Sequence, residues 1–388
     1  MAERTYVIGH VNPDTDSIAA AMGYAWLLQE RDGIEAIASR AGATNPQTTW
    51  ILKKLGLEAP YLLTDASPRF EAVTRRLDTT APDSPLRDAW AIASRTGGVA
   101  PVVNDDGTPY GLVTGLSLFN YLGKLVGTHK QRQEMRISEI LDLKSREACD
   151  TDVPRFQASM RIRDMVNRIL REEHNDFLVV DEKDLYVGVT RQRDVLNPPR
   201  LRVILVDHNE PGQALGALDE AELVEILDHH RLGNRSTHVP IRFTVDIVGS
   251  TSTLVSERIE EAGLSAPPAL AGMLLAGLLS DTLILTSPTT TPRDKQAAEL
   301  LGRWAFGVNG PLKGETVQSY GKQVIQAGAG LSTRDPQDIV STDIKIYTAG
   351  GLQFVIAQAE VTDLMQLDEH KVRLHDALNE LRERRGLD

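Results

Sequence analysis

Four short polar motifs, each at the end of an apolar segment, constrain the fold of this chain more than any other feature. The motifs are GHVNPDTDS at 9–17, VDHNE at 206–210, DHHR at 228–231 and SDT at 280–282. They contain six imidazole or carboxylate groups suited to divalent cations: His10, Asp14, Asp16, Asp207, His229 and Asp281. Aspartate is also an ordinary turn former and helix N-cap, so Asp16 alone is equally well explained by local structure. Gathering all six groups would be costly without cations between them, and the complete set therefore favours a two-cation site.

The segments that carry these motifs are typical of an α/β domain with a parallel sheet. Residues 1–65 begin with the strand YVIGH, a polar loop and the helical pattern IAAAMGYAWLLQE. Residues 199–308 resume this style with LRVILVDHN and ELVEILDHH as buried strands and ALAGMLLAGLLSDT as an apolar helix. Because parallel sheets bind ligands at the carboxyl ends of their strands, we expect the two blocks to form one discontinuous domain.

Residues 66–198 lie between these blocks and contain an internal repeat. The copies span 84–122 and 161–196, and each predicts a helix, a strand, an acidic turn, a strand and a helix. The repeat resembles a tandem pair of CBS domains. That resemblance implies regulation by an adenine nucleotide, either AMP, ADP, ATP or a diadenosine polyphosphate. The alternative is a dimerisation or spacer module without a ligand.

The CBS resemblance also implies residues that contact the nucleotide. In the second copy, Thr190 and Asp194 match the family's turn, in which the acid can accept hydrogen bonds from ribose hydroxyls. In the first copy Thr114 is present, but Ser117 takes the acidic position. We therefore expect tighter ribose binding in the second copy.

Composition excludes several other classes of protein. The chain has 42 basic and 54 acidic residues, a net charge of −12, and no long basic run, which argues against a nucleic-acid partner. The single cysteine, Cys149, excludes an internal disulfide framework and favours a reducing cytoplasm. No stretch of about 18 apolar residues occurs, so we expect no membrane span.

The ordered motifs NPDTDS, VDHNE, DHHR and SDT resemble those of family II inorganic pyrophosphatases in the DHH phosphoesterase superfamily, in the subgroup that carries CBS domains. The resemblance implies that His10, Asp14 and Asp207 hold one cation. Asp16, Asp207, His229 and Asp281 would hold the other, with Asp207 as the bridge. It also implies manganese or cobalt, two per site, with magnesium possible, and the mixed imidazole and carboxylate set is compatible with these metals.

The implied reaction is in-line attack of a water, activated by the two cations, on one phosphorus of pyrophosphate. Asp207 is the central catalytic carboxylate. His230, the second histidine of DHH, is expected to contact the substrate and to donate a hydrogen bond to a phosphate or leaving-group oxygen. Its alternative role is to orient a ligand, as we expect for Asp228. Asn209 is a further candidate for substrate binding.

Residues 312–388 predict a helix, two strands and a charged helix, which resemble the start of the family's second domain. Gln326 stands where the family usually has a substrate-binding lysine. Lys322 lies one helical turn earlier and is a candidate substitute, although a solvated surface lysine is the alternative. The chain ends after GLD, before the family's terminal Arg-Lys motif, so we expect this domain to be incomplete.

Three functions remain open at this point. The first is a nucleotide-regulated pyrophosphatase. The second is another DHH phosphoesterase that acts on polyphosphate or short nucleotides. The third is a metal- and nucleotide-binding sensor with impaired catalysis. The resemblance also implies a homodimer, because both the catalytic domain and paired CBS modules commonly associate.

Overall fold

The computed structural model describes residues 4–126, 136–233, 237, 239–308, 310–328, 335–341, 344–357 and 364–387. The chain forms two compact units. The first comprises Met1–Ala66 and Leu201–Asp388, and the second is Ser67–Arg200. Among the described helices, none is both long and apolar enough to cross a membrane.

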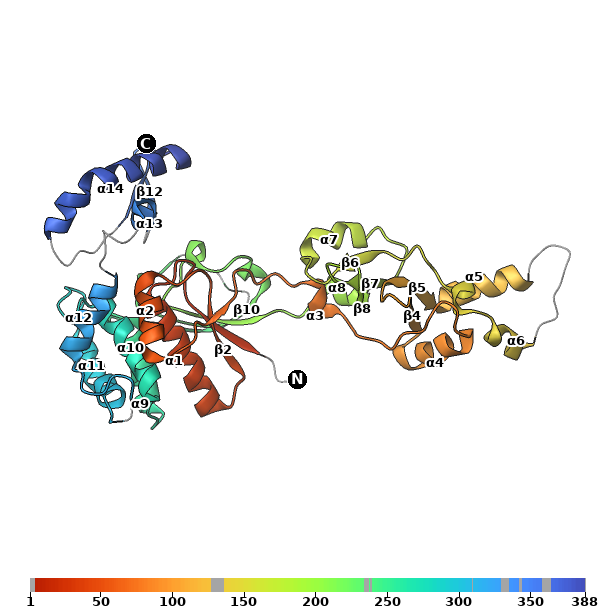
Figure 1. Ribbon diagram of the computed structural model, residues 1–388, viewed down its shortest axis with the longest axis horizontal. Helices are drawn as coiled ribbons and strands as arrows, with labels where there is room; N and C mark the ends of the chain where they lie inside the picture. The colour runs from red at the N-terminus through yellow and green to blue at the C-terminus, as the bar shows by residue number, and fades with distance from the viewer. Residues whose placement is uncertain are drawn as a thin grey trace. The chain divides into compact units, whose positions relative to one another are not determined.

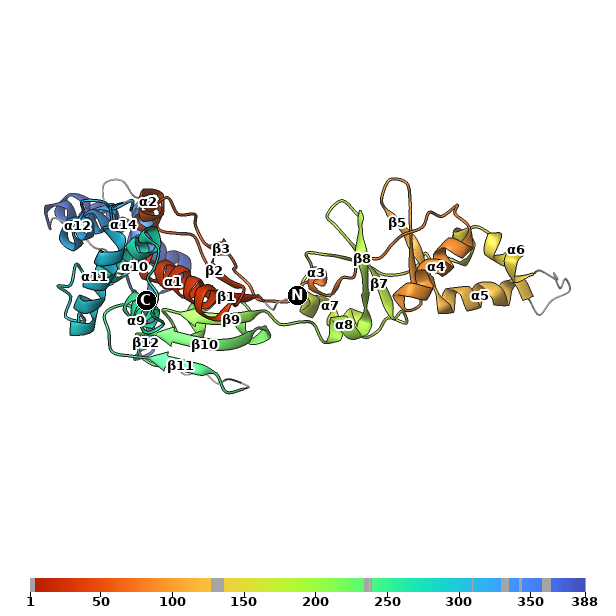
Figure 2. The same ribbon diagram turned by 90° about the horizontal axis from the view of Figure 1, so that it is seen from below.

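The first unit is built on a parallel sheet, as the sequence predicts (Figure 2). Six described strands lie in the order β11-β10-β9-β1-β2-β3. Their bounds are β1 (Thr5–Ile8), β2 (Ala36–Arg40), β3 (Tyr61–Leu62), β9 (Arg202–Val206), β10 (Glu222–Asp228) and β11 (Arg242–Val245). The first strand after the second unit, β9, pairs with β1. The two sequence blocks thus form a single sheet.

Helices lie on one face of this sheet (Figure 1). They are α1 (Thr15–Asp32), α2 (Pro46–Leu55), α9 (Thr251–Glu261), α10 (Pro268–Asp281), α11 (Pro292–Ala305) and α12 (Val317–Gly328). Helices α1 and α9 lie against the strands, and the others pack on these helices or on one another. Alternate residues of β9 separate the two cores: Ile204 and Val206 pack under the helices, whereas Val203 and Leu205 pack into a smaller core on the other face. Helix α10 is apolar on all sides because other helices surround it.

The second unit contains the predicted repeat. Its elements are α3 (Phe70–Val73), α4 (Leu86–Thr96), β4 (Val99–Val103), β5 (Pro109–Thr114), α5 (Gly115–Val126), α6 (Ile137–Asp142), β6 (Arg155–Gln157), α7 (Ile162–Ile169), β7 (Asp176–Val180), β8 (Tyr186–Arg191) and α8 (Gln192–Leu196). The strands β4 and β5 pair antiparallel, as do β7 and β8. Each hairpin has one register shift at the end of its first strand, between Val102 and Val103 in the first copy and between Val179 and Val180 in the second. The order helix, strand, turn, strand, helix is therefore confirmed in both copies.

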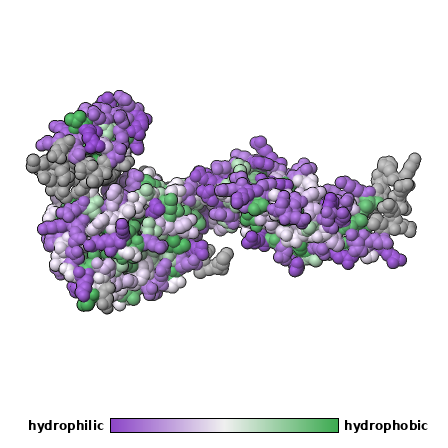
Figure 3. All heavy atoms as spheres, viewed as in Figure 1, coloured by the Kyte–Doolittle hydropathy of each residue, from purple (hydrophilic) through white to green (hydrophobic). Residues whose placement is uncertain are grey.

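The C-terminal segment contains α13 (Pro336–Ser341), β12 (Lys345–Ala349), β13 (Leu352–Ile356) and α14 (Leu364–Arg385). Its strands form an antiparallel hairpin, and a small core joins Val340 of α13 to Ala377 and Leu381 of α14. Helix α14 is largely hydrophilic on the face visible in Figure 3. The short helix α13 was not predicted from the sequence.

Candidate metal centre

The sheet brings three of the four motifs to one edge. His10 follows β1, Asp207 follows β9 and His229 follows β10, and these strands are neighbours in the sheet. From β1 the chain continues to β2 on one side, whereas β9 lies on the other side. Such a switch point leaves a crevice at the carboxyl ends of parallel strands.

Asp207 lies at the centre of this edge and is 1% exposed. Its φ is 63°, a left-handed conformation that is uncommon for a residue other than glycine. The backbone N–H still donates to the carbonyl of Leu227, at 3.0 Å, so the β9–β10 ladder continues up to this residue. An unfavourable backbone conformation held in place by surrounding structure is typical of functional sites.

The motif at 9–17 turns into α1 somewhat earlier than the sequence suggested. Asp14 is the N-cap, and its Oδ1 accepts a hydrogen bond from the backbone N–H of Ser17 at 2.9 Å. Asp16 lies inside the first turn of α1 rather than in the preceding turn, and it is fully buried. The second oxygen of Asp14 lies 3.5 Å from Nε2 of His10. The N-cap role and a role as a ligand are thus divided between the two oxygens of one carboxylate.

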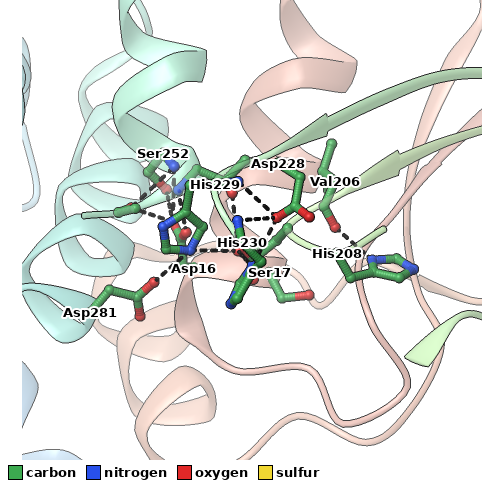
Figure 4. Close-up of polar contacts among 12 residues, drawn as sticks. Asp16, Ser17, Val206, His208, Asp228, His229, His230, Ser252 and Asp281 are labelled. Atoms are coloured by element: carbon green, nitrogen blue, oxygen red, sulfur yellow. Dashed lines mark hydrogen bonds and ion pairs between the residues drawn. The ribbon is translucent and has the colours of Figure 1, made fainter. Parts of the chain in front are cut away.

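The fourth motif reaches the same place from α10. Asp281 is the last residue of this helix, and its Oδ2 lies 3.9 Å from Nε2 of His229 (Figure 4). Thr282 is the C-cap, and the three residues after it, Leu283, Ile284 and Leu285, all have positive φ values, so the helix does not continue past this point.

The six predicted ligands form two overlapping groups. His10, Asp14 and Asp207 offer ligand atoms within 4.8 Å of one another, and so do Asp16, Asp207, His229 and Asp281. These groups coincide with the two sets implied by the family resemblance, and Asp207 belongs to both. A third group consists of Asp207, His229 and His230, but Nδ1 of His230 already lies 2.8 Å from Oδ1 of Asp228. The six predicted ligands together include four carboxylates, whose negative charge two divalent cations would neutralise.

Electrostatics indicate that this cluster retains protons by itself. Burial lowers the pKa of His10, but the carboxylates of Asp14 and Asp207 outweigh this effect and raise it to about 10. The pKa of His229 is likewise raised to about 10, because Asp207 and Asp16 outweigh burial. Burial and the charge of Asp207 raise the pKa of Asp16 to about 6. Burial and neighbouring carboxylates also raise the pKa of Asp281 well above its usual value. Divalent cations would displace these protons.

Two observations show that the donor set fits such cations. Oδ2 of Asp207 and Nε2 of His229 are buried atoms without a hydrogen-bond partner among the described residues. The other ring nitrogen of His229, Nδ1, lies 3.1 Å from the carbonyl of Val248. A carbonyl can only accept, so Nδ1 carries the hydrogen in the neutral ring and Nε2 presents its lone pair to the cluster.

His230 is oriented differently from its neighbour. Asp228 accepts hydrogen bonds from the backbone N–H groups of His229 and His230, at 2.8 and 3.1 Å, and also faces Nδ1 of His230. The side chain of His230 is 45% exposed. Burial opposes protonation, yet Asp228 and Asp207 raise the pKa of this imidazole. Asp228 therefore holds the DHH turn, and Nε2 of His230 is left to donate to a ligand.

Asn209 does not have the free amide that substrate binding would require. Its Nδ2 donates to Asp228 at 2.5 Å and to the carbonyl of Arg231 at 2.9 Å, and its Oδ1 accepts from the backbone N–H of Gly233. It is 1% exposed. The side chain of Asn209 thus holds the loop after β10, and its predicted contact with a substrate stays a prediction. His208 is also buried, and its ring is turned away from His229 (Figure 4).

The residues that hold Asp16 were not predicted from the sequence. Residues 249–253 include the N-cap and first turn of α9, and Oδ1 of Asp16 accepts from Ser250 Oγ at 2.7 Å and from the N–H of Ser252 at 3.0 Å. Buried Asp294 of α11 in turn accepts hydrogen bonds from the N–H of Gly249 and the hydroxyl of Thr253. The run GSTST was the available signal, but hydroxyl residues before a helix are common N-caps.

Lys322 and Gln326 are both exposed on α12. Among the described residues, no hydrogen bond or ion pair joins either side chain to the cluster. Their predicted relation to a substrate therefore stays a prediction.

In the second unit, strand register corrects one predicted equivalence. Gly111 pairs with Val102 and Gly188 pairs with Val179, each next to the register shift. When the two copies are aligned by this register, Ser117 is equivalent to Asp194, as expected. Thr114, however, is equivalent to Arg191, and Val113 is equivalent to Thr190. The error arose because both copies have a threonine near the strand end, one position apart in register.

The three predicted nucleotide contacts have different surroundings. Thr190 is fully buried and its hydroxyl donates to the carbonyl of Val73 at 3.1 Å. Asp194 lies in the first turn of α8, with its side chain 33% exposed, and Arg193 is 3.4 Å away. Thr114 borders a largely apolar cavity of about 320 Å³ between α4 and the start of α5, lined by Leu86, Trp90, Ala93, Ser94, Gly98, Val113, Thr114, Gly115 and Leu118.

Comparisons with known proteins agree with this geometry. The model of the DHH family, N-terminal domain, matches residues 4–278, and that of the DHHA2 domain matches residues 322–388. The "Cobalt-dependent inorganic pyrophosphatase" of Clostridium perfringens is 25% identical over 100% of this chain and 88% of its own length. The "Probable manganese-dependent inorganic pyrophosphatase" of Thermotoga maritima is 26% identical, covering 98% and 87%.

A solved structure shares the fold. It is described as a "putative family II inorganic pyrophosphatase" of Methanococcus jannaschii, with a TM-score of 0.56 and 22% identity. The match covers 99% of this chain and 80% of that one.

Proposed function

The chain belongs to the DHH family, and from this premise we propose that it hydrolyses inorganic pyrophosphate to two phosphates at a site for two divalent cations. One observation carries the proposal: the two overlapping ligand groups that share Asp207 at the carboxyl edge of the sheet. Relatives that match nearly the whole chain are named cobalt- or manganese-dependent inorganic pyrophosphatases, which supports the same substrate and these two metals. Magnesium remains a further candidate.

Bound cations would offset charge on the phosphoryl oxygens and lower the pKa of the attacking water. The protein's own part is to place its ligands and to supply a proton donor. His230 suits the second task, because Asp228 holds Nδ1 and the exposed ring leaves Nε2 to donate to a phosphate or leaving-group oxygen. Asp228 also favours the protonated ring and so keeps this donor available.

The substrate can be tested by phosphate release from pyrophosphate, linear triphosphate and a dinucleotide, with protein freed of metal and reloaded with manganese, cobalt or magnesium. We expect metal-dependent turnover with pyrophosphate as the fastest substrate. Faster cleavage of the dinucleotide would instead identify a different phosphoesterase. Metal binding without hydrolysis of any of the three would favour the sensor.

We also propose that the second unit binds an adenine nucleotide and regulates the enzyme. The cavity beside Thr114 is large enough for a base and mostly apolar, and the Ser94 and Thr114 hydroxyls on its wall can orient one. Asp194 offers a partly exposed carboxylate for ribose in the second copy, where the first copy has only Ser117.

Titration with AMP, ADP, ATP and a diadenosine polyphosphate would identify the nucleotide and its effect on rate. We expect Asp194→Ala to weaken binding more than Ser117→Ala, because only the first substitution removes a charged acceptor. Binding without any change in turnover would contradict regulation, and equal effects of the two substitutions would contradict the unequal sites.

A homodimer is the third part of the proposal. Strand β11 ends the described sheet, and nearby apolar side chains are exposed, including Phe243 at 45% and Ile247 at 86%. An open edge strand with apolar side chains favours pairing with another chain. Sedimentation analysis should show a dimer that Phe243→Lys weakens, whereas a monomeric wild-type protein would contradict this association.

A further inference from the structure

Gln47 of α2 contacts segments from three other helices of the first unit through one buried amide. The residue is 8% exposed. Its Oε1 accepts hydrogen bonds from Thr15 Oγ1 at 2.7 Å and from Ser280 Oγ at 3.0 Å. Thr15 lies between Asp14 and Asp16, and Ser280 directly precedes Asp281. One oxygen atom therefore joins the two chain segments that bring carboxylates to the cluster from α1 and α10.

The nitrogen of the same amide reaches α12. Nε2 donates to the carbonyl of Val324 at 3.0 Å. A Cβ added to Gly328, the last residue of α12, would lie 2.9 Å from this nitrogen, so the helix backbone rests directly against the amide. The DHHA2 match begins at residue 322, within this helix. The donor half of Gln47 thus holds the end of α12 from which the chain continues into the C-terminal segment.

We propose that Gln47 is a positioning residue that fixes the last turn of α12 relative to Asp16 and Asp281. An amide suits this task because a single planar group both accepts and donates. Losing it would leave buried hydroxyls and a carbonyl without this partner. The rest of α12 has an independent anchor, since the buried Tyr320 hydroxyl donates to the carbonyl of Gly272 at 3.2 Å. Removal of Gln47 should therefore release the last turn while the helix stays in place.

The kinetic consequence rests on the proposed function. Lys322 and Gln326 lie on α12, so freedom in its last turns would raise KM for pyrophosphate more than it lowers kcat. Two other readouts do not need turnover: hydrogen exchange of the backbone amides of residues 325–328, and affinity for Mn²⁺ alone. A wild-type protein without pyrophosphatase activity would defeat the proposed function, and these two readouts would still decide the role of Gln47.

The decisive experiment compares Gln47→Met, which keeps the length of the side chain, with Gln47→Glu, which keeps an oxygen to accept from Thr15 and Ser280. Both variants should exchange amides 325–328 faster than wild type. Only Gln47→Met should lose Mn²⁺ affinity, by about 10-fold, as is typical when a group that orients ligands is removed. Because Gln47→Glu retains the acceptor, it also serves if Gln47→Met does not fold.

Tyr320→Phe is the matched control, because it removes a hydrogen bond of α12 to Gly272, in the N-terminal part of α10, and leaves the bonds of Thr15 and Ser280 in place. It should lower stability but leave Mn²⁺ affinity and the ratio of KM to kcat unchanged. Unaltered exchange at 325–328 in both Gln47 variants would overturn the proposal. Equal loss of Mn²⁺ affinity in Gln47→Met and Tyr320→Phe would also overturn it, since the effect would then be one of general stability.

Discussion

The backbone N–H of Thr251 donates a hydrogen bond to Oδ2 of Asp16 at 2.6 Å, although the two residues are 235 positions apart. Thr251 begins α9, and its hydroxyl also donates to Oδ1 of Asp207 at 3.0 Å. One residue thus orients Asp16 and also Asp207, the carboxylate that the two ligand groups share. The positive end of the α9 dipole further favours negative charge on Asp16.

Thr251→Val tests this orientation, because valine has nearly the same shape and keeps the N–H that holds Asp16. Loss of the hydroxyl should free the Asp207 side chain and weaken Mn²⁺ binding by about 10-fold in a calorimetric titration. Thr286→Val is the control, since that exposed hydroxyl donates only to the carbonyl of Leu283 among the described groups. Unchanged affinity in Thr251→Val would show that the hydroxyl does not position Asp207.

Arg258 and Glu225 form a buried ion pair that fastens α9 to the sheet. Arg258 Nη1 lies 2.7 Å from Glu225 Oε1, the two side chains are 17% and 6% exposed, and Tyr24 donates to the other oxygen at 2.9 Å. Arg258→Met would remove the close, buried partner of this carboxylate and leave only the exposed Arg242, whose Nη1 lies 4.0 Å from Oε2 of Glu225. We expect urea unfolding followed by circular dichroism to show a loss of about 3–5 kcal/mol.

The exposed pair Arg4–Glu35 provides the comparison for that measurement. Arg4→Met should cost much less than Arg258→Met, because solvent screens both charges. Similar losses in the two variants would mean that burial does not strengthen the dependence of Glu225 on Arg258.

Cys149 gives a pH-dependent test of the second unit. Burial and the nearby carboxylate of Asp150 raise the pKa of this thiol to about 12. A raised pKa lowers the thiolate fraction at any given pH, and the thiolate is the nucleophile. Iodoacetamide at pH 8 should therefore alkylate the folded protein much more slowly than the protein in urea, and the rate should still rise up to pH 10.

The chain has a single cysteine, so the mass shift reports on this site alone. Alkylation of the folded protein at the rate of the unfolded chain would contradict the raised pKa and partial burial of Cys149.

The sequence predicted most of the framework because its signals are local. Asp207 and His229 each follow an apolar strand, and the carboxyl ends of parallel strands meet at one edge. The supporting residues were not predictable in this way. Gln47 and Asp294 act through partners that only the packing of α2, α10, α11 and α12 brings near them, and no spacing in the sequence marks those contacts.

Two of the predicted residues show what a linear motif leaves out. Asn209 adjoins the bridging acid in VDHNE, yet the loop after β10 turns back and uses its amide, which a linear motif does not reveal. Thr114 was equated with Thr190 by residue type, whereas pairing across the hairpins sets the register.

The most direct test of the central claim combines metal content and turnover in wild type and Asp207→Asn. The wild-type protein should bind two Mn²⁺ per chain and release phosphate from pyrophosphate only when loaded. Asp207→Asn removes the charge shared by both ligand groups, so it should lose most of its Mn²⁺ and reduce turnover by at least about 100-fold. Full turnover in Asp207→Asn, or in wild type stripped of metal, would contradict a two-cation centre built around Asp207.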